Sequence, residues 1–133
     1  MEDRFKFRIW DNETREYLEL VRTNYRYFID PCGKLIRQSK FNTSDICILS
    51  QLRYYVEQCV GLSDKNEKLI YAGDIVRVPY YGNLYPPKVI EVCISDCECH
   101  PFNSYNYSED GYGFPGDSEI IGNAHNNPEL LKN

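Results

Sequence analysis

The chain lacks a long apolar run. No stretch of its 133 residues approaches the roughly 20 consecutive apolar residues of a membrane-spanning helix. The N-terminus, MEDRFKFRIW, is charged and lacks the apolar stretch of about 7 to 15 residues that marks a signal peptide. We therefore expect a cytoplasmic protein with no membrane segment. Structural disulfides are rare in that compartment, so the six cysteines are expected to be free thiols.

Cations are scarce in the second half of the chain. Residues 67–133 contain 4 Lys or Arg and 10 Asp or Glu, a balance of -6, whereas residues 1–66 contain 11 and 10, a balance of +1. Binding to a phosphate backbone depends on clustered cations, so the acidic half is unsuited to it. Any nucleic-acid surface is therefore expected in the first half.

Histidine is scarce too, with only His100 and His125. Cys99 and His100 are adjacent in sequence, which gives no reason for a nucleophile and a base to lie within hydrogen-bond reach. The glycine-rich stretch DGYGFPGD lacks the preceding strand and the following Lys-bearing helix of a phosphate-binding loop. Asp74 follows Gly73 and is expected to cap a turn. We predict no enzymatic activity and no cofactor.

Short strands dominate what is present. Aromatic residues make up 14% of the chain, 12 of them Tyr, which favours strands. Residues 4–10 alternate cleanly between apolar and basic side chains. The expected strands are 4–10, 15–20, 25–29, 34–37, 53–60, 75–78, 88–94 and 119–121. This spacing predicts one mainly β domain over residues 1–133, a small barrel or sandwich.

The connections carry their own signals. Asp30, Pro31 and Gly33 predict a turn, and a second turn is expected at 65–67, with Asn66 in the left-handed conformation. Residues 44–52 fit a helix or a strand equally well. Residues 96–118 have neither period and predict a long aromatic loop within the domain. Near the end, Asn127 and Pro128 predict the cap and first residue of a short helix.

Three separated blocks carry a family resemblance: FKFRIWDNET at 5–14, QCVGLSDKNEKLIYAGDIVRV at 58–78 and IIGNAHNNPELL at 120–131. Together they resemble the YopX family of bacteriophage and prophage proteins. One departure is Glu67, which stands where the family usually has Gly, and a left-handed position would strain Glu. The resemblance implies a small, mostly β protein of phage or prophage origin that acts in the bacterial cytoplasm. It implies no known reaction and no catalytic residues.

The long loop supplies the leading functional hypothesis, which is association with a partner protein or with a second copy of the chain. Rigid aromatic side chains among Asn, Ser and Gly are typical of interaction surfaces. The residues predicted to form this surface are Phe102, Tyr105, Tyr107, Tyr112 and Phe114.

Nucleic-acid binding is the alternative. Cations interleaved with aromatic residues on a β surface are the means by which small barrels bind single strands. Tyr25 and Tyr27 interleave the cations of the first half. The residues predicted to form this surface are Arg4, Lys6, Arg8 and Arg26.

A metal site is the third hypothesis. Cys93, Cys97, Cys99 and His100 place four suitable ligands within eight residues. Their spacing is poor, because zinc sites usually pair cysteines on a tight turn and draw the second pair from elsewhere. The competing interpretation is incidental thiols that pack as small apolar side chains.

Overall fold

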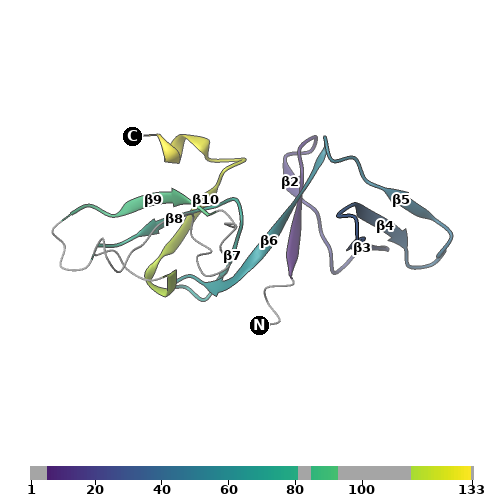
Figure 1. The fold of residues 1–133 in the computed structure, drawn as a ribbon, viewed down its shortest axis with the longest axis horizontal. Coiled ribbons are helices and arrows are strands. Elements are labelled where there is room, and N and C mark those ends of the chain that lie inside the picture. The colour runs from purple at the N-terminus through teal and green to yellow at the C-terminus, as the bar shows by residue number, and fades with distance from the viewer. Residues whose placement is uncertain (1–5, 81–84, 93–114, 133) are drawn as a thin grey trace. The chain divides into compact units, whose positions relative to one another are not determined.

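The computed structural model describes residues 6–80, 85–92 and 115–132. The chain divides into two compact units. The N-terminal unit comprises Arg8–Glu57, and the C-terminal unit comprises Met1–Phe7 with Gln58–Asn133. The described residues contain ten strands and two short 3-10 helices, so the expected mainly β class is confirmed, with a curled half-barrel sheet (Figure 1). The expectation of a single domain over 1–133 stays a prediction.

The N-terminal unit holds two sets of antiparallel strands. In the first, β1 pairs with β2 in a hairpin that aligns Trp10 with Tyr17. In the second, β4 lies between β3 and β5 (Figure 1). The strands are β1 (Phe7–Asp11), β2 (Glu16–Tyr17), β3 (Tyr25–Ile29), β4 (Leu35–Ser39), β5 (Ile46–Ile48) and the first residues of β6 (Tyr54–Ser63).

The turn chemistry of this unit explains its register. The Asp30 carboxylate accepts hydrogen bonds from the backbone N–H of Cys32 at 2.9 Å and of Lys34 at 2.8 Å, while Gly33 adopts φ +84°. This turn joins β3 to β4, as the sequence predicts. The open choice for 44–52 is settled as a short strand, β5, followed by a turn into β6.

The C-terminal unit is built around a three-stranded antiparallel sheet in the order β10-β8-β9. The last residues of β6 pair with β7, and a bulge interrupts the pairing of β10 with β8. Helix η3 contacts β9. The elements are β7 (Leu69–Tyr71), β8 (Asp74–Val78), β9 (Lys88–Glu91), η2 (Pro115–Asp117), β10 (Glu119–Asn123) and η3 (Pro128–Leu131).

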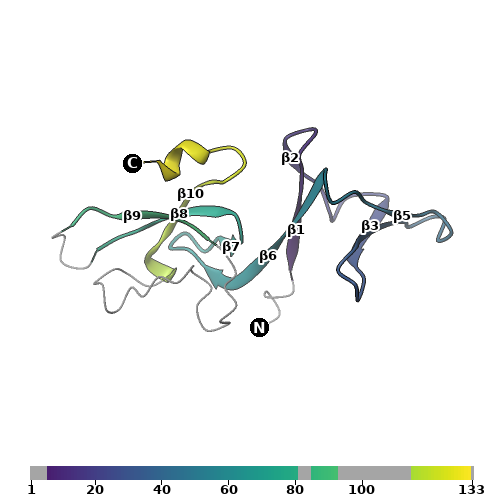
Figure 2. The same ribbon diagram turned by 45° about the horizontal axis from the view of Figure 1, so that its top comes forward.

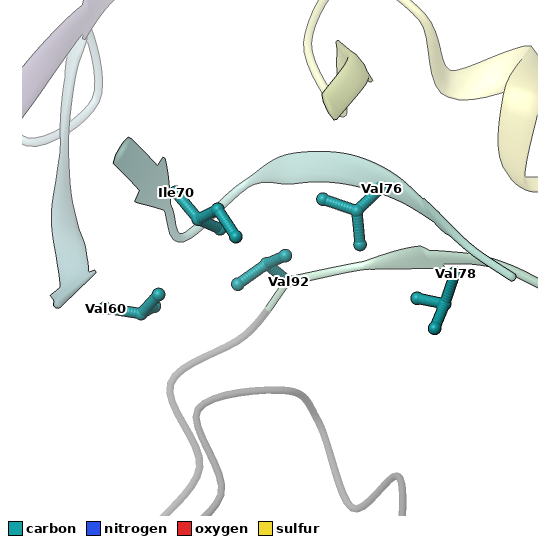
Figure 3. Packing of buried hydrophobic residues seen from close by; sticks show 5 residues of the cluster. All are labelled: Val60, Ile70, Val76, Val78 and Val92. Atoms are coloured by element: carbon teal, nitrogen blue, oxygen red, sulfur yellow. The ribbon is translucent and has the colours of Figure 1, made fainter. Parts of the chain in front are cut away.

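The core of the C-terminal unit is small and aliphatic. Its side chains alternate out of β6, β7 and β8 and meet Val92 after β9 (Figure 3). The cluster consists of Val60, Ile70, Val76, Val78 and Val92. β-branched residues suit this position because their stiff side chains pack well on a pleated surface.

The C-terminal helix is confirmed as one short 3-10 turn with Asn127 at the N-cap and Pro128 as its first residue, although the Asn127 side chain makes no capping bond. Its Oδ1 instead accepts from the backbone N–H of Asn123 at 3.3 Å. An ideal Cβ at Gly122 would lie 2.5 Å from that Oδ1, so the side chain occupies space that only a glycine leaves open.

One prediction is wrong at the turn between β6 and β7. The left-handed residue is Glu67, with φ +66°, and not Asn66. Asp64 fixes the turn, because its Oδ1 accepts hydrogen bonds from the backbone N–H of Asn66 at 2.9 Å and of Lys68 at 3.0 Å. The turn therefore forces a residue with a Cβ into a conformation that suits glycine.

Replacing Glu67 with glycine is expected to stabilise the protein by about 0.5 to 1 kcal/mol. The left-handed conformation costs a non-glycine residue roughly 1 to 2 kcal/mol, and the greater freedom of unfolded glycine offsets part of the gain. Urea unfolding of Glu67→Gly measures it. The control Asn66→Gly should not stabilise, and equal stabilisation by both variants would contradict the explanation.

Candidate interaction surface

Two of the predicted sites lie outside the described residues. The aromatic set Phe102, Tyr105, Tyr107, Tyr112 and Phe114 falls within 93–114, as does the set Cys93, Cys97, Cys99 and His100. Both stay predictions. In the described part of the chain, no group of three or more His, Cys, Asp or Glu could hold a metal ion, and Cys32, Cys47 and Cys59 are free thiols. No helix of the described residues is long and apolar enough to cross a membrane.

Only some residues of the predicted basic strand face are both described and exposed. Arg4 lies outside the described residues, and Lys6 is exposed. Arg8 is held within the fold: its Nε lies 2.8 Å from Glu57 Oε1, and its guanidinium lies 4.3 Å from the centre of the Tyr17 ring. The Tyr17 hydroxyl donates to the same Glu57 oxygen at 2.8 Å. Arg8 therefore acts as a packing and hydrogen-bonding residue of the N-terminal unit.

Arg26 is exposed, but the tyrosines beside it do not share its surface. Successive side chains of a strand point to opposite faces, so Tyr25 and Tyr27 lie on the face opposite Arg26. Tyr25 packs beneath Arg37 at 4.6 Å, and burial raises the pKa of Tyr27. Arg26 and the two tyrosine rings of β3 therefore lie on opposite faces of the sheet.

The structure exposes an apolar surface that the sequence analysis did not single out. Phe28 on β3, Ile36 on β4 and Ile48 on β5 are direct cross-strand neighbours. In the next row, Arg26 pairs with Gln38 and Gln38 with Ile46. We call these six residues the outer face of the β3–β5 sheet; the strands β3 and β5 are labelled in Figure 2.

Three side chains of the outer face are largely open to solvent. Phe28 is 40% exposed, Ile46 is 54% exposed and Ile48 is 61% exposed. On the opposite face of the sheet, Leu35 is only 4% exposed, whereas its cross-strand partner Ile29 is 42% exposed, so that face is buried at Leu35. Half-solvated antiparallel sheets usually present polar residues outward, so this arrangement marks a candidate interaction surface.

Positive charge surrounds these apolar side chains. Lys34 and Lys40 directly precede and follow β4, two residues from Ile36 and Gln38, so that continued alternation places them on the outer face. Both are exposed, as is Arg26. Asp30 shares this side of the sheet, but its carboxylate accepts the backbone N–H of Cys32 and Lys34. The surface thus combines an apolar centre with a cationic border.

A buried carboxylate supports the unit that carries this surface. Asp11 is 2% exposed and accepts from Arg53 Nε and Nη2, each at 2.9 Å, and from the backbone N–H of Glu13 at 3.0 Å. The Arg53 guanidinium holds the pKa of Asp11 well below its ordinary value, against the opposing effect of burial. Arg53 also contacts Glu13 at 2.9 Å, although both of these side chains are partly solvated.

A second buried carboxylate organises the C-terminal unit. Burial by itself would raise the pKa of Asp64, but hydrogen bonds from the backbone N–H of Ile120, Lys68 and Asn66 lower it below its ordinary value. Asp74 plays the predicted turn-capping role, since its Oδ2 accepts the backbone N–H of Tyr71 at 2.8 Å.

Acid is expected to destabilise the protein through these two carboxyls. Each carboxyl has a lower pKa in the folded protein than in the unfolded protein, where the pKa is about 4. The ionised carboxyls therefore stabilise the fold above about pH 4, and this stabilisation is lost as the pH falls below that value. Urea midpoints read by the fluorescence of Trp10, the sole tryptophan, should fall between about pH 5 and pH 3. Asp11→Asn should flatten that dependence, and an unchanged slope would contradict the assignment.

The sequence and the fold of this chain are similar to those of known proteins. The model of the family described as YopX protein matches residues 6–132. The crystal structure of protein EF1440 from Enterococcus faecalis is 27% identical, with a TM-score of 0.55, over 96% of this chain and 97% of that one. The crystal structure of protein yopX from Bacillus subtilis is 19% identical, with a TM-score of 0.60, over 95% and 97%. No curated protein matches the chain.

Proposed function

Because this chain belongs to the YopX family and carries an exposed apolar sheet face, we propose that it is a protein-binding module without enzymatic activity. The observation that carries the proposal is the outer face, where Phe28, Ile46 and Ile48 remain open to solvent on a sheet that buries Leu35 behind them. Apolar groups gathered on one face favour association, because covering them removes apolar surface from water.

The buried carboxylates of the described residues support a role without catalysis. A general acid at neutral pH needs a raised pKa, whereas those of Asp11 and Asp64 are lowered by the groups that hydrogen-bond to them. Asp11, Glu57, Asp64 and Asp74 each accept hydrogen bonds that hold a turn or a strand in place. Their positions are explained by the fold without a substrate.

The resemblance to YopX-like proteins leads us to propose a phage or prophage origin and action in the bacterial cytoplasm. Both solved structures named above come from bacteria, Enterococcus faecalis and Bacillus subtilis. In this setting the partner is a host or phage protein, or a second copy of the chain. The aromatic residues between 102 and 114 remain a second predicted contact surface.

A tagged pull-down from prophage-induced cells tests the proposed function. We expect a stoichiometric protein partner, identified by mass spectrometry, that survives nuclease treatment of the lysate. Recovery of the chain alone with the native mass of a monomer would contradict the proposal. A native mass of an oligomer would identify self-association as the activity.

Nucleic-acid binding remains the alternative, supported by exposed Lys6 and Arg26. Bound nucleic acid would appear as absorbance that nuclease removes and that declines with rising salt, since phosphate contacts release counterions. Such a result without a protein partner would replace the proposed function.

A further inference from the structure

We infer that the outer face of the β3–β5 sheet binds an acidic segment of a partner protein that presents apolar side chains at its centre. This inference rests on the proposed function and specifies the surface and the chemistry of the partner. Two cross-strand rows define the surface: Phe28–Ile36–Ile48, and Arg26–Gln38–Ile46. Side chains directly opposite on neighbouring strands lie about 5 Å apart at Cβ, so the apolar groups form one continuous patch.

The charge around the patch selects the partner. Arg26, Lys34 and Lys40 are exposed at its border, and among the described residues none of the three makes an ion pair. Asp30 lies two residues after Phe28, so the alternation of side chains places this acidic residue on the same face. Three cations and one carboxylate leave an excess of two positive charges, to which carboxylates of a partner are complementary.

A second copy of the chain does not suit this face. Two identical faces packed about a twofold axis would bring their cationic borders together. The outer face exposes three largely open apolar side chains, Phe28, Ile46 and Ile48, far fewer than the roughly 20 to 30 residues a side of a stable interface. A patch of this size suits a short segment.

The apolar centre favours protein over nucleic acid. Single-stranded nucleic acids bind by stacking on aromatic side chains, and this centre has one aromatic residue, Phe28, among three isoleucines. The tyrosines of β3 lie on the opposite face. Aliphatic side chains at the centre are instead matched by the Leu, Ile or Val of a peptide segment.

Fluorescence anisotropy with model peptides tests the inference on the full chain. The probes are an acidic amphipathic peptide of Glu and Leu, a second in which Lys replaces Glu, a third in which Ser replaces Leu, and a short oligothymidylate. We expect the first to bind and the others to bind at least about tenfold more weakly, since each loses the charge or the apolar match.

Substitutions in the outer face test whether the peptide binds there. The double variant Ile46→Thr and Ile48→Thr keeps β-branched side chains, and the triple variant Arg26→Gln, Lys34→Gln and Lys40→Gln removes the cationic border. Each should weaken binding about tenfold or more. Ile48→Val, which keeps an apolar side chain, should bind within about threefold of the parent. Matched controls are Leu52→Thr, at a residue 88% exposed outside the sheet, and Lys132→Gln, and neither should change binding.

Several results would overturn the inference. These are absence of peptide binding, equal binding of the Lys peptide, preferential binding of the oligothymidylate, or full affinity of the Thr variant with native circular dichroism. The pull-down separates this failure from that of the proposed function. A partner retained equally by the parent and by the Thr variant leaves the function standing and removes this face. Recovery of the chain alone with the native mass of a monomer removes the function itself.

Discussion

Replacing Asp11 with alanine is expected to lower the free energy of unfolding by about 2 kcal/mol. The Asp11 carboxylate accepts two hydrogen bonds from Arg53 and one from the backbone N–H of Glu13. Asp11 is 2% exposed, so its removal deprives Arg53 and the backbone N–H of Glu13 of a buried acceptor. The Arg53 side chain is 39% exposed and can be partly resolvated, so the cost is smaller than for a fully buried ion pair.

Urea unfolding followed by Trp10 fluorescence measures this loss, since Trp10 is completely buried next to Asp11 in β1. The matched control is Glu13→Ala. Glu13 contacts the same guanidinium, but its side chain is 70% exposed, so the change should be small. An equal effect of the two substitutions would show that the Asp11 contacts do not stabilise the fold as described.

Replacing Ile70 with alanine is expected to cost about 3 kcal/mol, within the usual range for removing a large aliphatic side chain from a core. Ile70 is completely buried in β7, and Val60, Val76, Val78 and Val92 belong to the same cluster (Figure 3). The β-branched neighbours have stiff side chains and cannot easily fill the cavity.

Urea unfolding followed by far-ultraviolet circular dichroism reports this change, and amide hydrogen exchange locates it in the C-terminal unit. Leu62→Ala is the control, because Leu62 lies on β6 in the same unit and is 37% exposed. It should cost about 1 kcal/mol or less. A loss of less than about 1 kcal/mol for Ile70→Ala would contradict the packing of this cluster.

The location of the proposed docking face also predicts how these two substitutions affect peptide binding. The outer face belongs to the N-terminal unit, which Asp11 and Arg53 stabilise, whereas Ile70 belongs to the C-terminal unit. At temperatures where both variants stay folded, neither substitution alters a residue of the face. Peptide binding should therefore survive each of them, and it should be lost only with Ile46, Ile48 or the cationic border.

The strands and most of the turns were predictable from the sequence because their causes are local. Alternation in 4–10 and β-branched content in 75–78 predicted β1 and β8. Asp30 and Gly33 predicted the β3–β4 turn through their own backbone preferences. Glu67 shows the limit of such reasoning, since Asn66 has the better intrinsic tolerance but the hydrogen bonds of Asp64 decide which residue is left-handed.

The sequence by itself determined a mainly β protein of YopX-like character, because alternation, turn residues and family motifs are all written within short stretches. Only the tertiary structure decided which residues pair across the fold and which side chains are exposed. It paired Arg8 with Glu57 across 49 residues and Asp11 with Arg53 across 42, contacts that no local pattern specifies. It also decided the burial of individual side chains in the β3–β5 sheet. Bulky residues occupy both faces of Tyr25–Ile29, so the strand pattern does not specify that Leu35 is buried while Phe28, Ile46 and Ile48 face solvent.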